Sequence, residues 1–421
     1  MISFHGSFEL SRQKTPMSKS TFFIGQPIFN QILQLIPRQL ISKAVIKHRS
    51  DHYSKRFRTY DHLITMLYAV FNNCQTLREI TTGMLASEQK LLHLGISHHP
   101  RRSTISDANS RRNVEVFEDI YKGLVARYGQ FLPDSRSKKR DSKTYIFDST
   151  SITLFQDVLC ASGLAPANGR QKGGIKVHTL MRLDQDVPCF VRFSSAVAND
   201  SSFLRQLQLP KGSIILFDRG YYDYTTYNRF TAEKITWVTR RRARSVHEVI
   251  ETNIISEKQQ QQGIISDQNI ILGNRFDKKS IKVNARLIIF KDPASGKIFE
   301  FLTNNLKLSC TTIPGLYKKR WSIELLFKRL KQNYPLKYFL GDNENAIKIQ
   351  IWCTLIADLL LKVIKKNIPR RWAFSNLVAM VRIHLMTYIN LFEFLKSPEK
   401  ALLISNLIKK QNQNPTLLFD T

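Results

Sequence analysis

Three acidic residues occupy positions where carboxylates are unusual. Asp148 interrupts the apolar run YIFDST, Asp218 ends the run IILFDRG, and Glu324 is the only acid in YKKRWSIELLFKRLK. Aspartate is a poor strand former and is costly to bury without a partner. Carboxylates gathered at one edge of a sheet can hold Mg²⁺ or Mn²⁺, and two such ions suit an in-line phosphodiester displacement. The simpler interpretation, that the two aspartates are capping or turn residues, requires no site.

Glu324 belongs to a predicted amphipathic helix from Tyr317 to Lys331. At ~100° per residue, a core-facing stripe forms on one side, made of Leu316, Ile323, Leu326, Phe327 and Leu330. A separate polar wedge contains Tyr317, Arg320, Glu324, Lys328 and Lys331. The single carboxylate in this cationic wedge either pairs with Lys328 at i, i+4, which contributes a few tenths of a kcal/mol, or is a third metal ligand.

The charge balance indicates a polyanionic partner. Lys and Arg number 64 against 33 acidic residues, a formal charge of +31. Nucleic acid is the first candidate for such a surface, and a cationic membrane-surface protein is the rival. No apolar span of membrane length is present, because the longest run, IWCTLIADLLL, is short and contains Asp358. The N-terminal stretch lacks the apolar segment of a secretory leader, and the five scattered cysteines favour a reducing cytoplasm.

The strands that would position the two aspartates can be predicted from periodicity. Residues 144–155, 173–184 and 187–197 read as an antiparallel meander, and 212–220 as a central strand buried on both faces. Helices near 200–209 and 224–234 and a strand at 235–242 complete the order βββ-α-β-α-β. If the strands carrying Asp148 and Asp218 are neighbours, their carboxylates converge.

The remaining chain is predicted to be helical at both ends, with a mostly β insertion near 243–305. Helical spacing marks 60–73 and 116–129, and Ser103 or Thr104 would cap a short helix that carries Arg111 and Arg112. These two arginines suit phosphate contact, although a solvated basic helix face is an equal alternative. The predicted organisation is a flexible tail at 1–20, a helical DNA-binding domain at 21–131, a linker at 132–143, a catalytic domain at 144–344 and a helical region at 345–421.

The combined motifs resemble the insertion-sequence-four family of bacterial DDE transposases. The family signature Y-x2-R-x3-E-x6-K is filled by Tyr317, Arg320, Glu324 and Lys331, and FDST and FDRGYYDY resemble its two aspartate motifs. The resemblance extends from about residue 25 to 390, because GQPIFNQIL, DHLITMLYAV and RRSTISDANSRR look like the helical domain that precedes the catalytic one. One departure is that Asn199 precedes Asp200 where many relatives have a histidine, so Asp200 is left outside the expected metal ligands.

This resemblance implies an α/β fold with a ribonuclease H-like core, a mixed five-stranded sheet with helices. It implies that Asp148, Asp218 and Glu324 bind two Mg²⁺ ions, for which Mn²⁺ can substitute, and that Tyr317, Arg320 and Lys331 contact the transposon end. The expected partners are double-stranded DNA, as inverted repeats and target, and a second copy in a homodimer. A bacterial cytoplasmic, nucleoid-associated location follows, without a membrane.

Further basic residues are candidates for DNA contact from the sequence itself. They are Lys328 in the polar wedge, Arg219 after the second aspartate, and Arg240 and Arg241 in the run TRRRAR, for which a solvated strand end is the alternative. Aromatic residues of the β insertion could hold a base turned out of the stack. Trp237 is a possible member but is predicted to be core, and His178 is predicted to be a satisfied strand residue.

Two other functions compete with a cut-and-paste transposase. A transposase-derived DNA-binding protein would keep the basic surface without the chemistry, yet it would have no reason to retain all three acids. A junction resolvase of the same fold needs neither the four-residue signature nor the β insertion.

Overall fold

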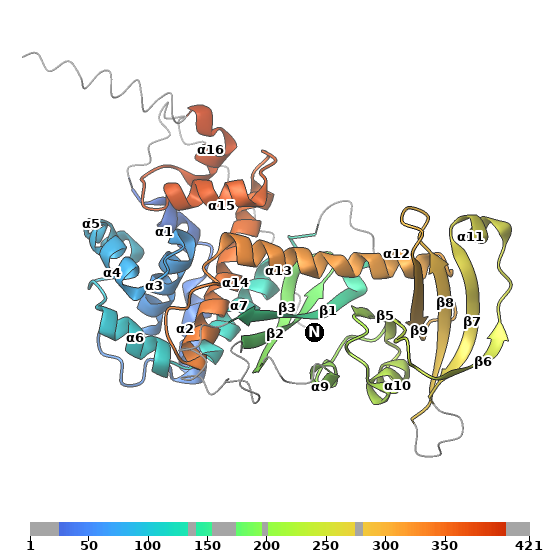
Figure 1. Cartoon of the computed structure of the whole chain (residues 1–421). Coiled ribbons are helices and arrows are strands. Elements are labelled where there is room, and N and C mark those ends of the chain that lie inside the picture. The colour runs from blue at the N-terminus through green and yellow to red at the C-terminus, as the bar shows by residue number, and fades with distance from the viewer. Residues whose placement is uncertain (1–24, 134–139, 154–173, 196–200, 274–280, 401–421) are drawn as a thin grey trace, which may run out of the picture.

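The computed structural model describes residues 25–133, 140–153, 174–195, 201–273 and 281–400. Its elements are arranged along one direction: helices gather at one end, a sheet extends from them to the other end, and a long helical segment crosses the sheet (Figure 1). This helical segment includes α13 (Ser322–Asn333), the helix that carries Glu324.

The described strands form one mixed sheet of nine strands, in the order β3-β2-β1-β4-β5-β9-β8-β7-β6. The strands are β1 (Thr144–Thr153), β2 (Gly174–Arg182), β3 (Val187–Ser195), β4 (Ile214–Phe217), β5 (Thr236–Arg240), β6 (His247–Thr252), β7 (Ile264–Leu272), β8 (Val283–Lys291) and β9 (Ile298–Thr303). Strand β4 is parallel to both of its neighbours, β1 and β5, and the other pairs are antiparallel.

The predicted first half of the sheet is confirmed. Strands β1, β2 and β3 form the antiparallel meander, and all four residues of β4 are buried. The apolar run needs no alternation because both faces of β4 are covered. Trp237 of β5 is fully buried against Tyr227, and the His178 Nε2 atom lies 2.9 Å from the Ser194 hydroxyl oxygen, so both are packed residues as predicted. The helix expected near 200–209 is shorter, α9 (Ser201–Leu204).

The β insertion continues this same sheet. Strand β9 pairs antiparallel with β5, and β8, β7 and β6 follow outward. The sequence prediction missed β7, whose apolar pattern is broken by polar residues; one of them, Asp267, receives two hydrogen bonds from Arg286 of β8. The segment EKQQQQG before β7 contains a short helix, α11 (Glu257–Gln261), capped by Ser256.

The helices before and after the sheet pack together at one end of the molecule. Helix α14 contacts α3, α6 and α7, and the Ile28 N–H donates to the Thr387 carbonyl at 3.0 Å. The α-helices of this end are α1 (Ile28–Leu33), α2 (Arg38–His48), α3 (Thr59–Asn72), α4 (Leu77–Leu85), α5 (Glu88–Leu91), α6 (Arg102–Arg111), α7 (Glu115–Tyr128), α14 (Glu344–Asn367), α15 (Phe374–Ile383) and α16 (Leu391–Lys396). Helix α10 (Tyr224–Ala232) lies beside β5 and β8 of the sheet. The domain boundaries drawn from the sequence stay predictions.

The helix expected from Tyr317 to Lys331 is a run of three consecutive segments. These are α12 (Thr312–Lys318), the 3₁₀ turn η3 (Lys319–Trp321) and α13 (Ser322–Asn333). Its predicted core stripe is confirmed, since all five members are buried: Leu316, Ile323, Leu326, Phe327 and Leu330. Helix α13 packs against β1, which brings Glu324 to the strand of Asp148. Other 3₁₀ turns are η1 (Leu92–Leu94) and η2 (Asp141–Lys143).

The short basic helix α6 begins earlier than predicted. Its N-cap is Arg101, in an extended conformation after Pro100, so Ser103 and Thr104 lie inside the helix and neither caps it. Among the described helices, none is both long and apolar enough to cross a bilayer.

Candidate active site

The two aspartates lie side by side because their strands are parallel neighbours. Phe147 of β1 pairs in register with Phe217 of β4, and Asp148 and Asp218 are the next residues along each chain. Both phenylalanines are fully buried, so the register places the acids at the point where the apolar core ends. The sequence prediction that the two carboxylates converge is confirmed by this pairing.

Arg320 connects the first aspartate to the glutamate. Its Nη1 donates to Oδ2 of Asp148 and its Nη2 donates to Oε1 of Glu324, each at 2.7 Å. The Arg320 side chain is 10% exposed and that of Asp148 is 17% exposed, whereas Glu324 is 35% exposed, so the ion pair with Asp148 is the better shielded of the two. Two carboxylates from elements 176 residues apart in sequence (324 − 148) are therefore held at one positive group.

The second aspartate, Asp218, contacts the first residue of the signature, Tyr317, and a further arginine, Arg240. The Tyr317 hydroxyl donates to Oδ1 of Asp218 at 3.2 Å, and the Arg240 guanidinium lies 3.6 Å from the same oxygen. Arg240 and Arg320 both lie over the Tyr317 ring, with guanidinium carbons 5.7 and 5.6 Å from its centroid. The cationic side chains thus form a frame around the acids.

The protonation of the two aspartates differs. Burial raises the pKa of Asp148 to about 6 against the attraction of Arg320, and the negative charges of Asp218 and Glu324 raise it further. Burial also acts on Asp218, but the Gly220 N–H and the guanidinium groups of Arg320 and Arg240 outweigh it and lower the pKa of Asp218. Near neutral pH, Asp148 is the acid whose charge is most easily lost.

The donor set suits a hard divalent cation, since carboxylate oxygens are the ligands that Mg²⁺ and Mn²⁺ prefer. As placed in the described part of the chain, no group of three His, Cys, Asp or Glu side chains is gathered closely enough to hold a metal ion. The Arg320 guanidinium lies between Asp148 and Glu324 instead. The pair Asn199-Asp200, at which the sequence departs from the family pattern, lies outside the described residues.

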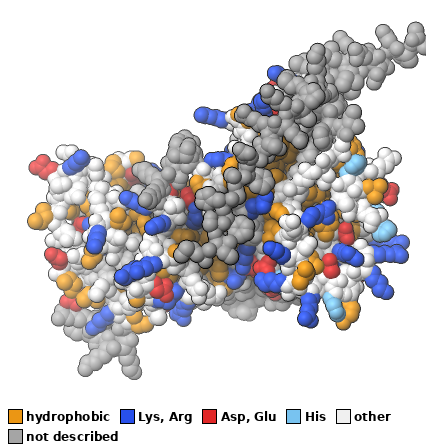
Figure 2. Space-filling view, turned by 180° about the vertical axis from the view of Figure 1, so that it is seen from behind, with side chains coloured by type: hydrophobic (Ala, Val, Ile, Leu, Met, Phe, Trp, Pro, Cys, Tyr) orange, Lys and Arg blue, Asp and Glu red, His pale blue; other side chains and the backbone are white. Residues whose placement is uncertain are grey.

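The basic residues expected to contact DNA occupy different environments. Lys328, Arg219 and Arg111 are exposed, and Lys331 is exposed while its Nζ donates to the Ser151 carbonyl at 2.9 Å. Figure 2 shows Lys and Arg side chains spread across the face seen from behind, with Asp and Glu among them. Arg241 is less free, because it pairs with Glu300 of β9.

Arg112 lies inside the fold. It is 8% exposed, and its Nη2 donates to the Phe57 carbonyl at 2.8 Å and to the Ser54 hydroxyl at 3.3 Å. These bonds connect the end of α6 to the segment between α2 and α3 rather than to an outside partner, and a backbone carbonyl acceptor cannot be recognised from sequence.

A hollow of about 1040 Å³ lies between the insertion strands and the signature segment. Its aromatic lining includes Phe299 and Phe301 of β9 together with Tyr317 and Trp321, and Trp321 is 58% exposed. The insertion therefore does present aromatic side chains beside Arg320.

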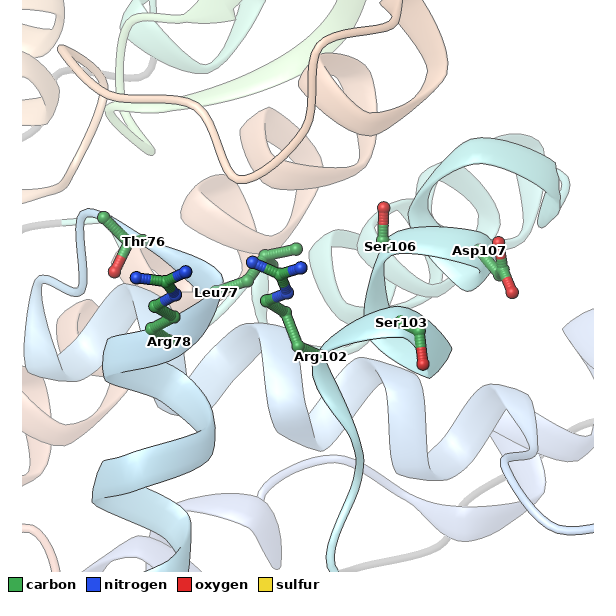
Figure 3. A pocket seen from close by; sticks show the side chains of 7 residues that line it. All are labelled: Thr76, Leu77, Arg78, Arg102, Ser103, Ser106 and Asp107. Carbon is green, nitrogen blue, oxygen red and sulfur yellow. The ribbon is translucent and has the colours of Figure 1, made fainter.

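Sequence reasoning missed two arginines of the helical end, Arg78 and Arg102, which line a second hollow (Figure 3). A signal existed for Arg78: Thr76 and Glu79 have the spacing of a capping box, and the Glu79 N–H does donate to the Thr76 hydroxyl at 3.2 Å. That motif would have located the start of α4 and the arginine in its first turn.

The fold and the site together define a mixed α/β protein with an acidic centre inside a basic frame, a class suited to a nucleic-acid partner. Comparison with known proteins gives the family. Residues 139–360 match the transposase DDE domain, and residues 24–97 match a domain of unknown function, DUF4372.

Two curated relatives carry transposase names. The chain is 33% identical over 265 residues to "Putative transposase y4zB" of Sinorhizobium fredii, covering 63% of this chain and 71% of that protein. It is 27% identical over 273 residues to "Putative transposase for insertion sequence element IS4SA" of Synechocystis, covering 62% of this chain and 71% of that protein.

A solved structure is also similar, the "Cryo-EM structure of piggyBac transposase synaptic complex with hairpin DNA". The TM-score is 0.41 at 11% identity, over 95% of this chain and 82% of that chain, which is too low to carry an argument. The domain match spans more than half of the sequence, so the chain belongs to the DDE transposases of the insertion-sequence type, and the resemblance found in the sequence is confirmed.

Proposed function

We propose that this chain cuts DNA at the terminal inverted repeats of an insertion sequence and joins the resulting 3′ ends to target DNA. The observation that carries the proposal is the convergence of Asp148, Asp218 and Glu324 from β1, the end of β4 and α13, with Arg320 bonded to two of them. The family match supports the DNA substrate and the reaction class.

In this proposal Asp148, Asp218 and Glu324 are the catalytic residues and hold two divalent ions, generally Mg²⁺ in DDE transposase domains. When bound, such ions activate the attacking oxygen and stabilise the leaving oxygen of an in-line displacement. Water attack cuts the strand and a 3′-hydroxyl attack joins it, so one site serves both steps.

The basic frame performs the positioning. Arg320 and Tyr317 already contact the carboxylates, so they lie where a scissile phosphate would have to enter. Arg240 beside Asp218, and Lys331 and Lys328 further along α13, would neutralise the neighbouring phosphates and fix the register of the strand. Exposed Arg219 and Arg111 extend this basic surface.

The aromatic hollow between β9 and η3 would receive a base turned out of the duplex, since Trp321 and Phe299 offer stacking faces next to Arg320. The core strands β1–β5 with their helices would form the ribonuclease H-like unit. Two copies would act together, because two element ends must be held before either is joined.

The reaction can be tested with a duplex that carries the element's own end, labelled at the 3′ terminus, and a target plasmid. Incubation with Mg²⁺ should give a cut at the end of the inverted repeat and then a joined plasmid product. If the protein only retards the duplex in a gel and leaves it intact, it is a DNA-binding protein derived from a transposase, and the proposal is wrong.

A further inference from the structure

Two hollows adjoin at the turn between α3 and α4. The first, about 640 Å³, is lined by Asn73 and Gln75 of that turn and by residues of α13 and the segment after it, among them Lys328, Lys331 and Lys337. The second, about 550 Å³, begins at Thr76 and includes Arg78 and Arg102. Gln75 lines the first hollow and Thr76, the next residue in the chain, lines the second. A ligand that occupied both hollows would therefore cross the protein backbone between these two residues.

The second hollow brings two guanidinium groups together. Arg78 belongs to α4 and Arg102 to α6, and Figure 3 shows their side chains rising side by side into the same space. Both are exposed, and no ion pair within the described ranges involves either one. Two like charges that line one hollow repel each other, and an anion bound between them would offset that repulsion.

The nearby acids form no ion pair with these two arginines among the residues that the structure describes. Asp107 also lines the hollow but lies further along α6, away from both guanidinium groups in Figure 3. Glu79 is used in capping α4, where its carboxylate accepts the Gln75 N–H at 2.8 Å. Guanidinium forks match phosphate oxygens in two-point contacts, so a phosphate is the anion that this pair fits best.

The first hollow connects this pair to the acidic centre. Lys328 and Lys331 follow Glu324 on α13 at i+4 and i+7, the spacing of one helix face. The Lys331 Nζ donates to the carbonyl of Ser151, three residues after Asp148 on β1. A line of cations therefore runs from the acids, along α13, to Arg78 and Arg102, which suits an extended chain of phosphates better than a single small anion.

We propose that the two hollows form one contact for the DNA backbone, in which Lys328, Lys331 and Lys337 hold the phosphates next to the acidic centre and Arg78 and Arg102 hold those further from it. This deepens the proposed function and rests on it. It assigns to Arg78 and Arg102 a contact with the same duplex whose strand enters the acidic site.

The test measures the salt dependence of binding. Fluorescence anisotropy with a labelled inverted-repeat duplex should give a slope of log K against log[NaCl] that is smaller by about 2 in Arg78→Gln/Arg102→Gln, at roughly 0.9 per lost phosphate contact. The matched control is Lys43→Gln/Arg127→Gln, which removes two exposed charges from α2 and α7 outside both hollows. Its slope should stay at the wild-type value, and an equal loss in both variants would overturn the proposal.

Two further measurements test whether Arg78 and Arg102 contact phosphates. Arg78→Lys/Arg102→Lys keeps the charges and should restore most of the slope, so failure to restore it overturns a phosphate contact. Hydroxyl-radical footprinting should show lost protection only beyond the nucleotides nearest the cut in the glutamine variant. Binding can be scored with no cutting at all, so an inactive wild-type protein would refute the proposed reaction while leaving this contact to be judged on the slopes.

Discussion

The protonation of Asp148 gives a stability effect that can be calculated from the structure. Its pKa of about 6 against an ordinary 3.8 means that the folded protein binds this proton more tightly than the unfolded chain does. The difference of about 2.2 units corresponds to roughly 3 kcal/mol at 1.36 kcal/mol per unit. The side chain is 17% exposed, so solvent screening reduces this figure only modestly.

The sign follows from proton binding. Because the folded pKa is raised, the favourable contribution is fully present below about pH 4 and is lost as pH rises through about 6. Above that pH the ionised Asp148 lowers the free energy of unfolding. Asp148→Asn removes the titration and can still accept the hydrogen bond from Arg320. The free energy of unfolding of this variant should therefore increase relative to that of the wild type as pH rises.

The assay is urea unfolding of both proteins between pH 4 and pH 8, in buffer free of divalent ions and DNA. The free energy of unfolding of the wild type minus that of Asp148→Asn should fall by roughly 2 kcal/mol between pH 4 and pH 7, because at pH 4 the unfolded chain is already partly ionised at this position. Asp292→Asn is the control, because the hydrogen bond from Ser295 lowers the pKa of Asp292, and the corresponding difference should be nearly constant above pH 5. If the difference between the wild type and Asp148→Asn is flat, or rises with pH, the reasoning is refuted.

Two other predictions follow from ion pairs. Arg320→Gln removes the cation bonded to Asp148 and Glu324, so the affinity of the DNA-free protein for Mn²⁺ should rise on the order of tenfold. Electron paramagnetic resonance measures this affinity, and Arg320→Lys, which keeps the charge, should change it little. An unchanged Mn²⁺ affinity in Arg320→Gln would contradict the prediction. Arg329→Met removes the nearer of two cations that pair with Asp358, which is 2% exposed, 3.2 Å from Arg329 Nε and 4.0 Å from Lys362 Nζ, and the loss should cost about 3 kcal/mol in urea unfolding. The control is Arg371→Met at an exposed position, which should lower the free energy of unfolding by less than about 0.5 kcal/mol. Equal losses in the two variants would show that the buried ion pair does not stabilise the fold more than an exposed arginine does.

The first half of the sheet could be predicted because its signals are local. The short run IILF without alternation favours a strand covered on both faces, and the β-branched alternation around Asp148 fits the neighbouring meander. The core stripe of α13 is equally local, since five apolar residues repeat at helical spacing. From these elements the meeting of Asp148 and Asp218 could be predicted only on the condition that their strands are neighbours, and the pairing of β1 with β4 meets that condition.

The rest depends on partners distant in sequence. Strand β7 has polar residues at positions that look like a loop, and only Arg286 of β8 makes Asp267 acceptable inside the sheet. The continuation of the sheet from β5 to β9 depends on a pairing, Val238 with Thr303, that no periodicity encodes. Arg112 reads like any exposed basic residue until its carbonyl acceptor at Phe57 is known.

The same distinction between local signals and partners distant in sequence holds for the site. The spacing of Arg320 and Glu324 at i, i+4 was visible in the sequence, but the bond from Arg320 to Asp148 spans 172 residues and required the fold. The pair Arg78 and Arg102 was missed for this reason as well, because α4 and α6 bring together two arginines that look ordinary separately.

The central claim is that Glu324 acts in the cutting of DNA together with the two aspartates. The most direct measurement is the rate of cutting of a labelled element end in Mg²⁺ by the wild type, by Glu324→Gln and by the control Glu344→Gln on α14, with duplex affinity measured in parallel. Glu324→Gln should bind the duplex as the wild type does and cut it at least about 100-fold more slowly, beyond the loss typical of removing an outer partner of a ligand. Glu344→Gln should cut normally. If Glu324→Gln cuts at the wild-type rate, Glu324 is not part of the active site and the account is wrong.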